Sequence, residues 1–331
     1  MEYRTLGRTG LKVPEIGFGC GATAGLLTRD MQEKQLAVAQ LALKLGINYF
    51  DTASAYGNGT SETNLGEVLK KTGANVTLAT KVRIGPEDLT NLREATIASV
   101  NQSLKRLGRS SVDLIQLHGR VASTRENQSF ALTPQEVLGS KGVLEGFKAL
   151  REQGKVRYFG APALGDPQSL HALIESGEFD TIMVYYNLLN PSAGHSVPES
   201  FSALDYGRLI EKAAASDMGV IIIRVLAKGA LTDSPPQATG SENTLSPGSD
   251  YKVDLQRAQK LKWLVSGDTK TFPQAAIRFA LTKPEVSTVL VGFSELDHVE
   301  QAVSCSGAGG LPDETMGRLK SYWESDFTST S

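Results

Sequence analysis

Short apolar runs alternate along the chain with longer stretches in which apolar residues recur at helical spacing. In the stretch 31–45 the apolar positions fall on one face of a helix, and Gly46 follows as a natural end. Asp30 and Glu33 have the spacing of a capping box, so we expect the helix to begin there. The next run, 48–51, is short and apolar and ends in a carboxylate, which is typical of a strand.

The same alternation predicts the elements of the whole chain. Strands are expected at 14–19, 48–51, 76–80, 112–117, 156–160, 180–184, 219–223 and 287–291. Helices are expected at 31–45, 62–71, 88–107, 143–153, 167–176, 203–216, 254–266, 272–282 and 295–304. Residues 2–14, around a Gly-Arg-Thr-Gly turn, are expected to form a hairpin, and 312–323 a C-terminal extension.

About eight apolar strands separated by helices indicate a buried parallel sheet of the α/β class. Eight units favour closure into a (β/α)8 TIM barrel, with an N-terminal β-hairpin and a C-terminal extension, over an open doubly wound sheet. No linker-like boundary divides residues 1–331, so one domain is expected. Residues 17–22 loosely fit the dinucleotide fingerprint of a Rossmann fold, but that motif needs a helix opening directly on its glycines.

Composition narrows the classes of function. Of 331 residues, 40% are hydrophobic and 21% charged, and the formal net charge of −2 gives no case for a nucleic acid or an anionic membrane as partner. Two cysteines cannot form a disulfide framework or a metal cluster, so no metal site is expected. The chain starts without an apolar signal core and has no membrane-length apolar run. We expect a soluble cytoplasmic protein.

Four reactive side chains follow three successive predicted strands. They are Asp51 and Tyr56 after the first, Lys81 after the second and His118 after the third. Each alone has an ordinary structural explanation: a turn-forming aspartate, a surface tyrosine, a solvated lysine or a core histidine. In a barrel, however, the carboxyl ends of the strands converge on one rim, where barrel enzymes carry their active sites.

The chemistry that uses such a set is proton transfer to an oxygen. An ammonium at Lys81 would stabilise the phenolate of Tyr56, and Asp51 would hold that ammonium in place. His118 could donate to or orient a carbonyl oxygen. The chain has no Gly-x-Ser-x-Gly elbow and no metal-ligand spacing, so nothing indicates hydrolysis. Carbonyl reduction requires a hydride carrier, whereas a barrel isomerase using Lys81 as a Schiff base stays open on residue types alone.

Three connections, 119–133, 185–200 and 224–253, are longer than usual and all follow strands, so they would cover the rim. The loops that could contact a substrate contain Leu26, Leu27, Arg120, Phe130 and Tyr251 as possible wall residues. No pattern among these residues selects between small aldehydes, ketones and sugars.

Several segments together resemble the aldo-keto reductase superfamily. The matching segments are 3–13, 50–57, 80–82, 113–118, 154–160 and 186–189. The resemblance implies a barrel that binds a nicotinamide dinucleotide in an extended pose without a Rossmann domain. It also implies that Asp51, Tyr56, Lys81 and His118 are the catalytic tetrad, with Tyr56 as general acid and hydride from nicotinamide C4. A non-catalytic or regulatory relative, like the channel-associated β subunits of this superfamily, is the alternative.

The resemblance further implies a set of cofactor contacts. They are Gly21, Asp51, Tyr186, Arg224, Leu226, Lys228, Leu231, Gly292, Ser294, His298 and Gln301. Around the nicotinamide, however, the chain departs from the family pattern. Ala161 and Pro162 stand where the family usually has Ser-Asn, Met183 where it has glutamine, and Ile223 where it commonly has an aromatic residue or arginine.

The residues expected to bind the adenosine end of the cofactor do not decide between NADP(H) and NAD(H). Relatives that prefer NADP tend to have a lysine or arginine beside the serine that corresponds to Ser294. Here Glu295 and Asp297 are acidic and disfavour a phosphate dianion, and only Ser294 and His298 could bind it. On the habit of the family we expect NADP(H) ahead of NAD(H). The oligomeric state is left open.

Overall fold

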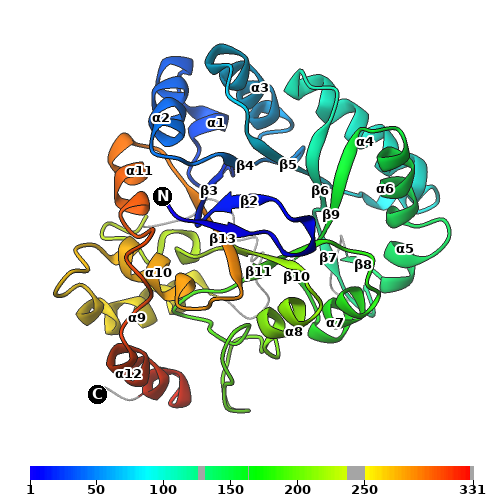
Figure 1. Cartoon of the computed structure of the whole chain (residues 1–331). Coiled ribbons are helices and arrows are strands. Elements are labelled where there is room, and N and C mark those ends of the chain that lie inside the picture. Colours follow the sequence, from blue (N-terminus) through cyan, green and yellow to red (C-terminus); the bar gives the residue numbers. More distant parts are fainter. Residues whose placement is uncertain (126–130, 163, 237–249, 329–331) are drawn as a thin grey trace.

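Eight parallel strands close into a barrel in the order β11-β12-β13-β3-β4-β5-β6-β9, as shown in Figure 1. The computed structural model describes residues 1–125, 131–162, 164–236 and 250–328. The barrel strands are β3 (Ile16–Gly19), β4 (Tyr49–Asp51), β5 (Thr77–Val82), β6 (Val112–Leu117), β9 (Val156–Ala161), β11 (Thr181–Tyr185), β12 (Gly219–Ile223) and β13 (Val286–Gly292). The expected TIM barrel is confirmed, and the Rossmann alternative is wrong.

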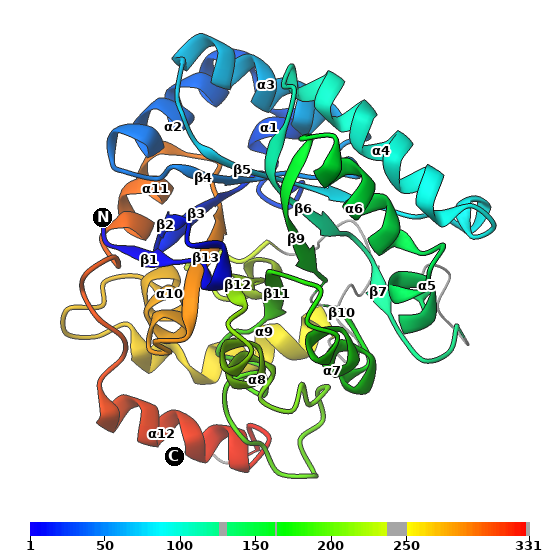
Figure 2. The ribbon, with the colours of Figure 1, turned by 45° about the vertical axis from the view of Figure 1, so that its right-hand side comes forward.

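Helices surround the barrel (Figures 1 and 2). They are α1 (Leu26–Arg29), α2 (Gln32–Lys44), α3 (Thr60–Thr72), α4 (Leu92–Leu107), α5 (Pro134–Leu138), α6 (Val143–Glu152), α7 (Pro167–Glu175), α8 (Leu209–Ala215), α9 (Tyr251–Lys260), α10 (Phe272–Leu281), α11 (Leu296–Val303) and α12 (Asp313–Glu324). The C-terminal helix α12 is anchored by the indole Nε1 of Trp323, which donates to the carbonyl oxygen of Leu188 at 3.0 Å.

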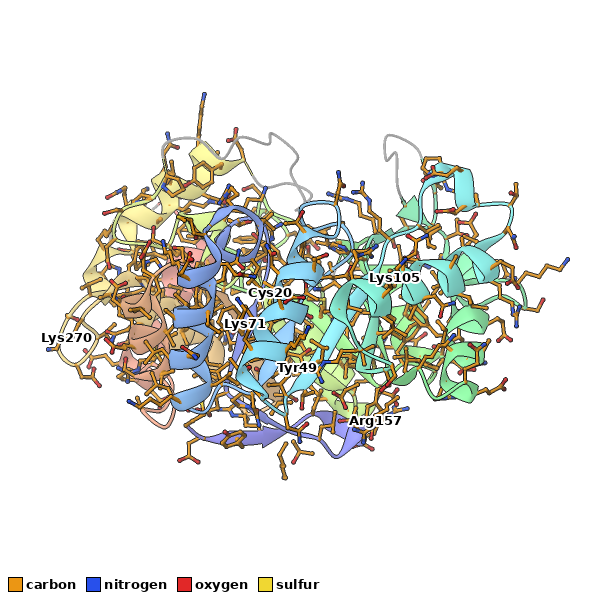
Figure 3. All side chains as sticks on the ribbon, turned by 90° about the horizontal axis from the view of Figure 1, so that it is seen from above. Cys20, Tyr49, Lys71, Lys105, Arg157 and Lys270 are labelled. Carbon is orange, nitrogen blue, oxygen red and sulfur yellow. The ribbon has the colours of Figure 1, made fainter. Side chains whose placement is uncertain are left out.

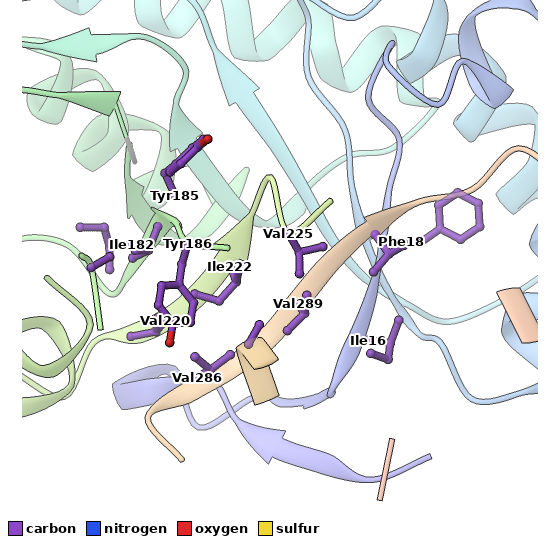
Figure 4. Packing of buried hydrophobic residues seen from close by; sticks show 14 of the residues in the cluster. Ile16, Phe18, Ile182, Tyr185, Tyr186, Val220, Ile222, Val225, Val286 and Val289 are labelled. Atoms are coloured by element: carbon purple, nitrogen blue, oxygen red, sulfur yellow. The ribbon is translucent and has the colours of Figure 1, made fainter. Parts of the chain in front are cut away.

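The two faces of each strand divide the core into an outer layer and a filled interior. Alternate residues such as Ile182 and Ile222 point outward against the helices, as Figure 4 shows. The intervening residues, including Met183 and Ile221, fill the barrel. Tyr49 is fully buried, whereas Lys270 and Arg157 lie near the edge of the molecule in Figure 3. Because side chains fill the interior, the barrel is a packed core and its chemistry belongs at a rim.

A hairpin of β1 (Tyr3–Thr5) and β2 (Lys12–Pro14) closes the lower end of the barrel, and Leu6 and Val13 belong to its interior cluster. Gly7, in the turn, has φ +49°, and a Cβ there would lie 2.1 Å from the backbone nitrogen of Gly219. Only glycine permits this approach. The reactive end is therefore the opposite rim, where the carboxyl ends of the strands lie.

Several predicted helix boundaries were wrong. The Asp30–Glu33 capping box does not form: Asp30 caps the C-terminus of α1, and α2 starts after Met31 without a side-chain cap. Helix α4 starts at Leu92, because residues before it form a separate 3-10 turn. Helix α8 is shorter than the predicted 203–216, because Arg208 at its start adopts φ 56°. The predicted helix 254–266 divides into α9 and a 3-10 turn.

The long connection after β6 contains structure that the sequence pattern did not predict. Short strands β7 (Arg120–Val121), β8 (Ala131–Leu132) and β10 (Leu164–Gly165) form a small parallel sheet in the order β10-β7-β8. Each strand is only two residues long, which is too short for a period of two to be recognised. Phe130, a possible wall residue, lies outside the described residues.

In the described residues, no helix is both long and apolar enough to span a membrane. The cytoplasmic location and the single domain over 1–331 stay predictions.

Candidate active site

Lys81 is at the centre of a buried network at the ends of β4 and β5. Its Nζ pairs with Oδ1 of Asp51, donates to the carbonyl oxygen of Thr52 at 2.7 Å and lies 3.4 Å from the hydroxyl of Tyr56. Lys81 is 1% exposed and Asp51 2%. Asp51 and Lys81 come together because their strands, β4 and β5, are adjacent and parallel. The network brings together three of the four predicted catalytic residues.

Tyr56 reaches the network from a turn between β4 and α3. Its backbone nitrogen donates to the oxygen of Ala53 at 3.1 Å, and its own oxygen accepts from the nitrogen of Ser61 in α3. The turn thus holds the ring over the rim while leaving the side chain only partly buried. Lys81 Nζ lies 4.9 Å from the ring centroid, so the ammonium faces both the hydroxyl and the ring.

His118 completes the predicted set. It follows β6 directly, and its backbone nitrogen donates to the oxygen of Val82 at 2.6 Å. Its ring stands edge-on to Tyr56, with centroids 5.4 Å apart and planes at 83°. Burial lowers the pKa of His118 to about 3, helped by the positive charges of Lys81, Arg83 and Arg224. His118 is therefore neutral at physiological pH and can offer a hydrogen bond without a charge.

The electrostatics of Lys81 favour its charged form. Burial by itself lowers the pKa of this lysine, but the carboxylate of Asp51 and the hydroxyl of Tyr56 outweigh burial and raise it above its ordinary value. A Schiff-base lysine needs a neutral amine, which requires a lowered pKa. The isomerase alternative therefore loses its physical basis, and the network acts as a fixed ammonium next to a phenol.

Gln116 belongs to the network although sequence reasoning missed it. Its Nε2 donates to Oδ2 of Asp51 at 2.7 Å, and the side chain is fully buried. With one carboxylate oxygen held by Gln116 and the other by Lys81, Asp51 has a single orientation. The signal in the sequence was a glutamine in the apolar stretch just before His118, because a buried polar side chain must find a partner.

The glycines predicted to contact a cofactor lie at the exits of β3 and β13. A Cβ on Gly21 would be 3.8 Å from Cζ of Tyr56, so this position adjoins the catalytic ring. A Cβ on Gly292 would approach Cβ of Ala24 to 2.8 Å, which is too close for any residue but glycine without a shift of the neighbouring backbone. Gly292 pairs in register with Gly19 of the next strand. A side chain at Gly292 would therefore clash, whereas one at Gly21 would begin with an ordinary van der Waals contact to Tyr56.

The loop after β12 has an unusual backbone. Arg224, Ala227 and Lys228 all have positive φ, at 60°, 45° and 58°. Such residues are strained unless the surroundings require them, and they occur at functional sites. The side chain of Asn187 holds the loop, since its Nδ2 donates to the oxygen of Arg224 at 3.0 Å.

The loop carries two basic residues, Arg224 and Lys228, and follows the seventh strand of the barrel. Barrel enzymes often bind phosphate after the seventh and eighth strands. Leu226 starts a 3-10 turn here, and Leu231 is fully buried, so both shape the loop rather than supply charge. The backbone N–H groups of Ala227, Gly229, Ala230 and Leu231 donate to carbonyl oxygens within the loop, so an anion here would meet the side-chain cations rather than these groups.

The predicted nicotinamide end is apolar. Met183 belongs to the interior cluster, and Ile223 packs against that cluster. Ala161 ends β9 fully buried. Asn187 does not replace the missing polar groups, because its amide oxygen accepts from the nitrogens of Leu189 and Asn190. Any side-chain contact to a carboxamide must therefore come from elsewhere on the rim.

Tyr186 lies away from the rim. Its ring stacks on Phe279 of α10 at 4.7 Å, and it has no exposed surface. The alternation along β11 directs the preceding residue, Tyr185, to the side of Met183, where it stacks on Tyr206. The predicted contact of Tyr186 with a cofactor is not supported by this placement. The period of two along β11 was the signal in the sequence that these neighbouring tyrosines face opposite sides of the strand.

At the adenosine end, Ser294 and His298 lie together, with Oγ and Nδ1 3.2 Å apart. Gln301 lies further along the same helix, α11. A cation missed by the sequence reasoning is also present. Lys34 of α2 pairs with Glu295, whose hydrogen bond raises the pKa of Lys34. Because α2 and α11 are neighbours in the fold (Figure 1), residues far apart in sequence share this corner.

Of the predicted wall residues, Leu26 and Leu27 belong to the hydrophobic core and are 2% exposed. Tyr251 starts α9 and its hydroxyl donates to the oxygen of Pro236 at 2.8 Å. Arg120 lies on β7, above the rim. Within the described part of the chain, no group of three or more potential ligands could hold a metal ion.

Comparison with known proteins identifies the family. A sequence model of the Aldo/keto reductase family matches residues 15–324. The chain belongs to this family. L-galactose dehydrogenase of Arabidopsis thaliana is 28% identical over 98% of this aldo/keto reductase and 95% of its own length. A second Arabidopsis protein, named "Probable voltage-gated potassium channel subunit beta", is 24% identical over 91% of this chain and 90% of its own.

A solved structure agrees with the fold of this aldo/keto reductase. The holo form of the aldo-keto reductase AKR11C1 from Bacillus halodurans superposes with a TM-score of 0.72, at 23% identity over 98% of this chain and 97% of that one.

Proposed function

We propose that this aldo/keto reductase is an NAD(P)H-dependent oxidoreductase that reduces an aldehyde or ketone to an alcohol, or carries out the reverse reaction on a sugar or alcohol. The observation that carries the proposal is the position of Lys81 Nζ, which contacts Asp51, the oxygen of Thr52 and the hydroxyl of Tyr56 together. A phenol next to a fixed ammonium is prepared to give up a proton.

The residues divide the work as follows. Tyr56 gives its proton to the carbonyl oxygen, and Lys81 stabilises the phenolate that remains. Asp51, oriented by Gln116, keeps Lys81 charged and in place. Neutral His118 donates a hydrogen bond that orients the carbonyl oxygen beside Tyr56. A bound nicotinamide supplies the hydride from its C4.

For the coenzyme we propose NADP(H) ahead of NAD(H). Arg224 and Lys228 would hold the pyrophosphate, and Ser294, His298 and Lys34 the 2′-phosphate. Lys34 supports this order because it adds a cation beside Ser294. Its pair with Glu295 is exposed, and exposed ion pairs cost little to open. Glu295 is the opposing feature, and its removal is tested below.

A second candidate is a cofactor-binding protein without catalysis, and the apolar surroundings of Met183 and Ile223 favour it. One relative is named as a channel subunit. The two functions differ in whether hydride leaves the bound cofactor.

For the catalytic function we propose a small carbonyl compound or a sugar as substrate, and we propose that the protein acts in the cytoplasm.

Stopped-flow oxidation of bound NADPH by a panel of aldehydes tests the proposal. We expect wild-type protein to oxidise the cofactor and Tyr56→Phe to lose about 100-fold or more in turnover. The affinity of Tyr56→Phe for NADPH should stay within a few fold, which titration of the cofactor fluorescence measures. Absence of hydride transfer to every carbonyl from a demonstrably bound cofactor would support the second candidate instead.

A further inference from the structure

A second polar network lies behind the proposed catalytic one, on the outer side of the barrel at β5. Glu62, in the first turn of α3, has no exposed surface. Its Oε1 accepts a hydrogen bond from Oγ1 of Thr80 at 2.5 Å, and its Oε2 accepts one from Nε of Arg106 at 2.6 Å. Because Arg106 belongs to α4, this one carboxylate joins a barrel strand to two of the helices that cover it.

Thr80 connects Glu62 to the strand that carries the proposed catalytic lysine. Thr80 and Lys81 are consecutive in β5, so their side chains point to opposite faces of the strand. Lys81 faces the site, where its Nζ donates to the carbonyl oxygen of Thr52. Thr80 faces α3 and donates to Glu62. The carboxylate of Glu62 therefore holds β5 one residue before the ammonium.

Ser61 connects the same turn of α3 to Tyr56. Its backbone nitrogen donates to the carbonyl oxygen of Tyr56 at 3.2 Å. Its hydroxyl donates to the carbonyl oxygen of Cys20 at 3.0 Å and lies 2.9 Å from Oγ1 of Thr52. The first turn of α3 is therefore tied to the exits of β3 and β4 and to the backbone of the tyrosine itself.

Arg106 packs against the loop between Tyr56 and α3. Gly59, the residue before α3, has φ 87°, and a Cβ there would lie 2.5 Å from Cδ of Arg106. The guanidinium is held by Glu62 through Nε, and its Nη2 donates to Oγ of Ser103 at 3.1 Å. Glu62 thus fixes the arginine side chain on which the loop rests.

We propose that Glu62 is a positioning residue that sets the distance between Nζ of Lys81 and the hydroxyl of Tyr56, 3.4 Å, by holding the strand of one and the loop of the other. This inference rests on the proposed function, because it concerns the same proton transfer. Glu62 does not touch the reacting atoms. Without its carboxylate, β5 and the Tyr56 loop can shift relative to each other, and a shift of about 1 Å can cost about 100-fold in rate.

Glu62→Gln tests the inference, and Glu15→Gln is its matched control. Glu15 is also buried, pairs with Arg4 at 2.6 Å and accepts a hydroxyl hydrogen bond, from Ser306 at 3.0 Å. It precedes β3 and so lies at the opposite end of the barrel. The side chains of Arg4 and Arg106 are 25% and 26% exposed, so the two substitutions release similarly placed charges. Urea unfolding should show a similar loss of stability for both variants.

Stopped-flow reduction of 4-nitrobenzaldehyde and of glyceraldehyde, followed by the loss of NADPH fluorescence, measures hydride transfer. We expect Glu62→Gln to slow this step about tenfold or more, and Glu15→Gln to change it less than about twofold. The dissociation constant for NADPH should stay within a few fold in both variants, which places the loss in the rate and not in cofactor binding. Equal rates for the two variants overturn the inference.

Thr80 provides a second test that keeps the carboxylate in place. Thr80→Val removes the hydroxyl that donates to Glu62 but keeps a β-branched side chain, whereas Thr80→Ser keeps the hydroxyl. We expect hydride transfer to slow several-fold in Thr80→Val and to stay close to the wild-type rate in Thr80→Ser. Equal rates for these two variants would show that Glu62 does not act through β5, and would overturn the inference.

Hydrogen exchange of residues 53–61 separates the inference from the proposed function, because it needs no catalysis. The nitrogens of Tyr56 and Ser61 are hydrogen-bonded in this segment, and Glu62→Gln should speed their exchange while Glu15→Gln should not. Faster exchange in Glu62→Gln, with no hydride transfer in wild type, would overturn the proposed function and leave the hold of Glu62 on the loop standing. Unchanged exchange, in a protein whose wild type reduces aldehydes, would overturn the inference alone.

Discussion

The exits of β4, β5 and β6 differ sharply from the exits of β9, β11 and β12. At the first region, Asp51, Lys81 and Gln116 form a connected, buried polar network. At the second, Met183 and Ile223 present apolar side chains. Under the proposed function, proton transfer would depend on side chains that constrain one another, whereas cofactor binding would depend more on the shape of the backbone.

The polar network is tightly constrained because its charges are buried. A buried ion pair is tolerated only when both partners are fully hydrogen-bonded. Lys81 meets this condition with Asp51 and the oxygen of Thr52, and Asp51 meets it with Gln116. The apolar second region has no charge that a substitution would leave unpaired, so replacements of similar volume there should cost less than removal of one partner in the first region. The first region should therefore be the more sensitive to mutation.

The largest expected effect is at Lys81. Lys81→Met leaves Asp51 buried without its cation, and breaking such a pair costs about 3–5 kcal/mol of unfolding free energy. Turnover should fall at least about 100-fold, because the phenolate of Tyr56 loses its stabilising charge. Urea unfolding and stopped-flow hydride transfer measure the two effects. Near-normal kcat would show that the network is structural.

The next effect concerns pH and stability. The folded pKa of His118, about 3, lies below the ordinary value of 6.5, so the unfolded chain binds more protons between these values. The contribution of neutral His118 is complete above pH 6.5 and is lost as pH falls toward 3. It amounts to a few kcal/mol.

His118→Asn removes this linkage. Its unfolding free energy should therefore fall less steeply than that of wild type when urea denaturation is repeated from pH 7 to pH 4. His195, whose pKa burial lowers to about 4, is retained in both proteins and serves as a shared background. Parallel pH profiles for the two proteins would contradict the assigned state of His118.

A substitution with a smaller expected effect adds a polar group to the apolar region and so makes the two regions more alike. Met183→Gln places an amide beside the proposed nicotinamide seat, and one net hydrogen bond should tighten cofactor binding about three- to tenfold. The apolar control Met183→Leu should give no gain. Fluorescence titration with NADPH measures both dissociation constants. Equal affinities for the two variants would show that the backbone already satisfies the carboxamide.

The smallest effect concerns the adenosine end. Glu295→Gln removes the shorter of the two ion pairs of Lys34, leaving the pair with Asp30 at 3.8 Å, and should lower the dissociation constant for NADPH a few fold, with less change for NADH. Adding Lys34→Ala should cancel the gain. Titrations at two salt concentrations check the cause, because exposed charges are screened by salt. A gain that persists in the double variant would exclude Lys34 as the phosphate ligand.

Local pattern was sufficient for much of the fold. Apolar runs such as 219–223, with helices between them, identified all eight barrel strands and their parallel arrangement. Boundaries failed where tertiary contacts act: Asp30 caps α1 rather than α2, and Arg208 starts α8 later than its periodicity suggests. Strands as short as β7 carry no periodic signal at all.

By itself, the sequence determined which residues stand at the strand ends, because strand length and the position of Asp51, Lys81 and His118 are local properties. Only the tertiary structure decided their partners. Gln116 on Asp51, Lys34 on Glu295 and the outward direction of Tyr186 all depend on which strands and helices become neighbours when the barrel closes. Contacts between segments distant in the chain carry no local pattern, and closure alone creates them.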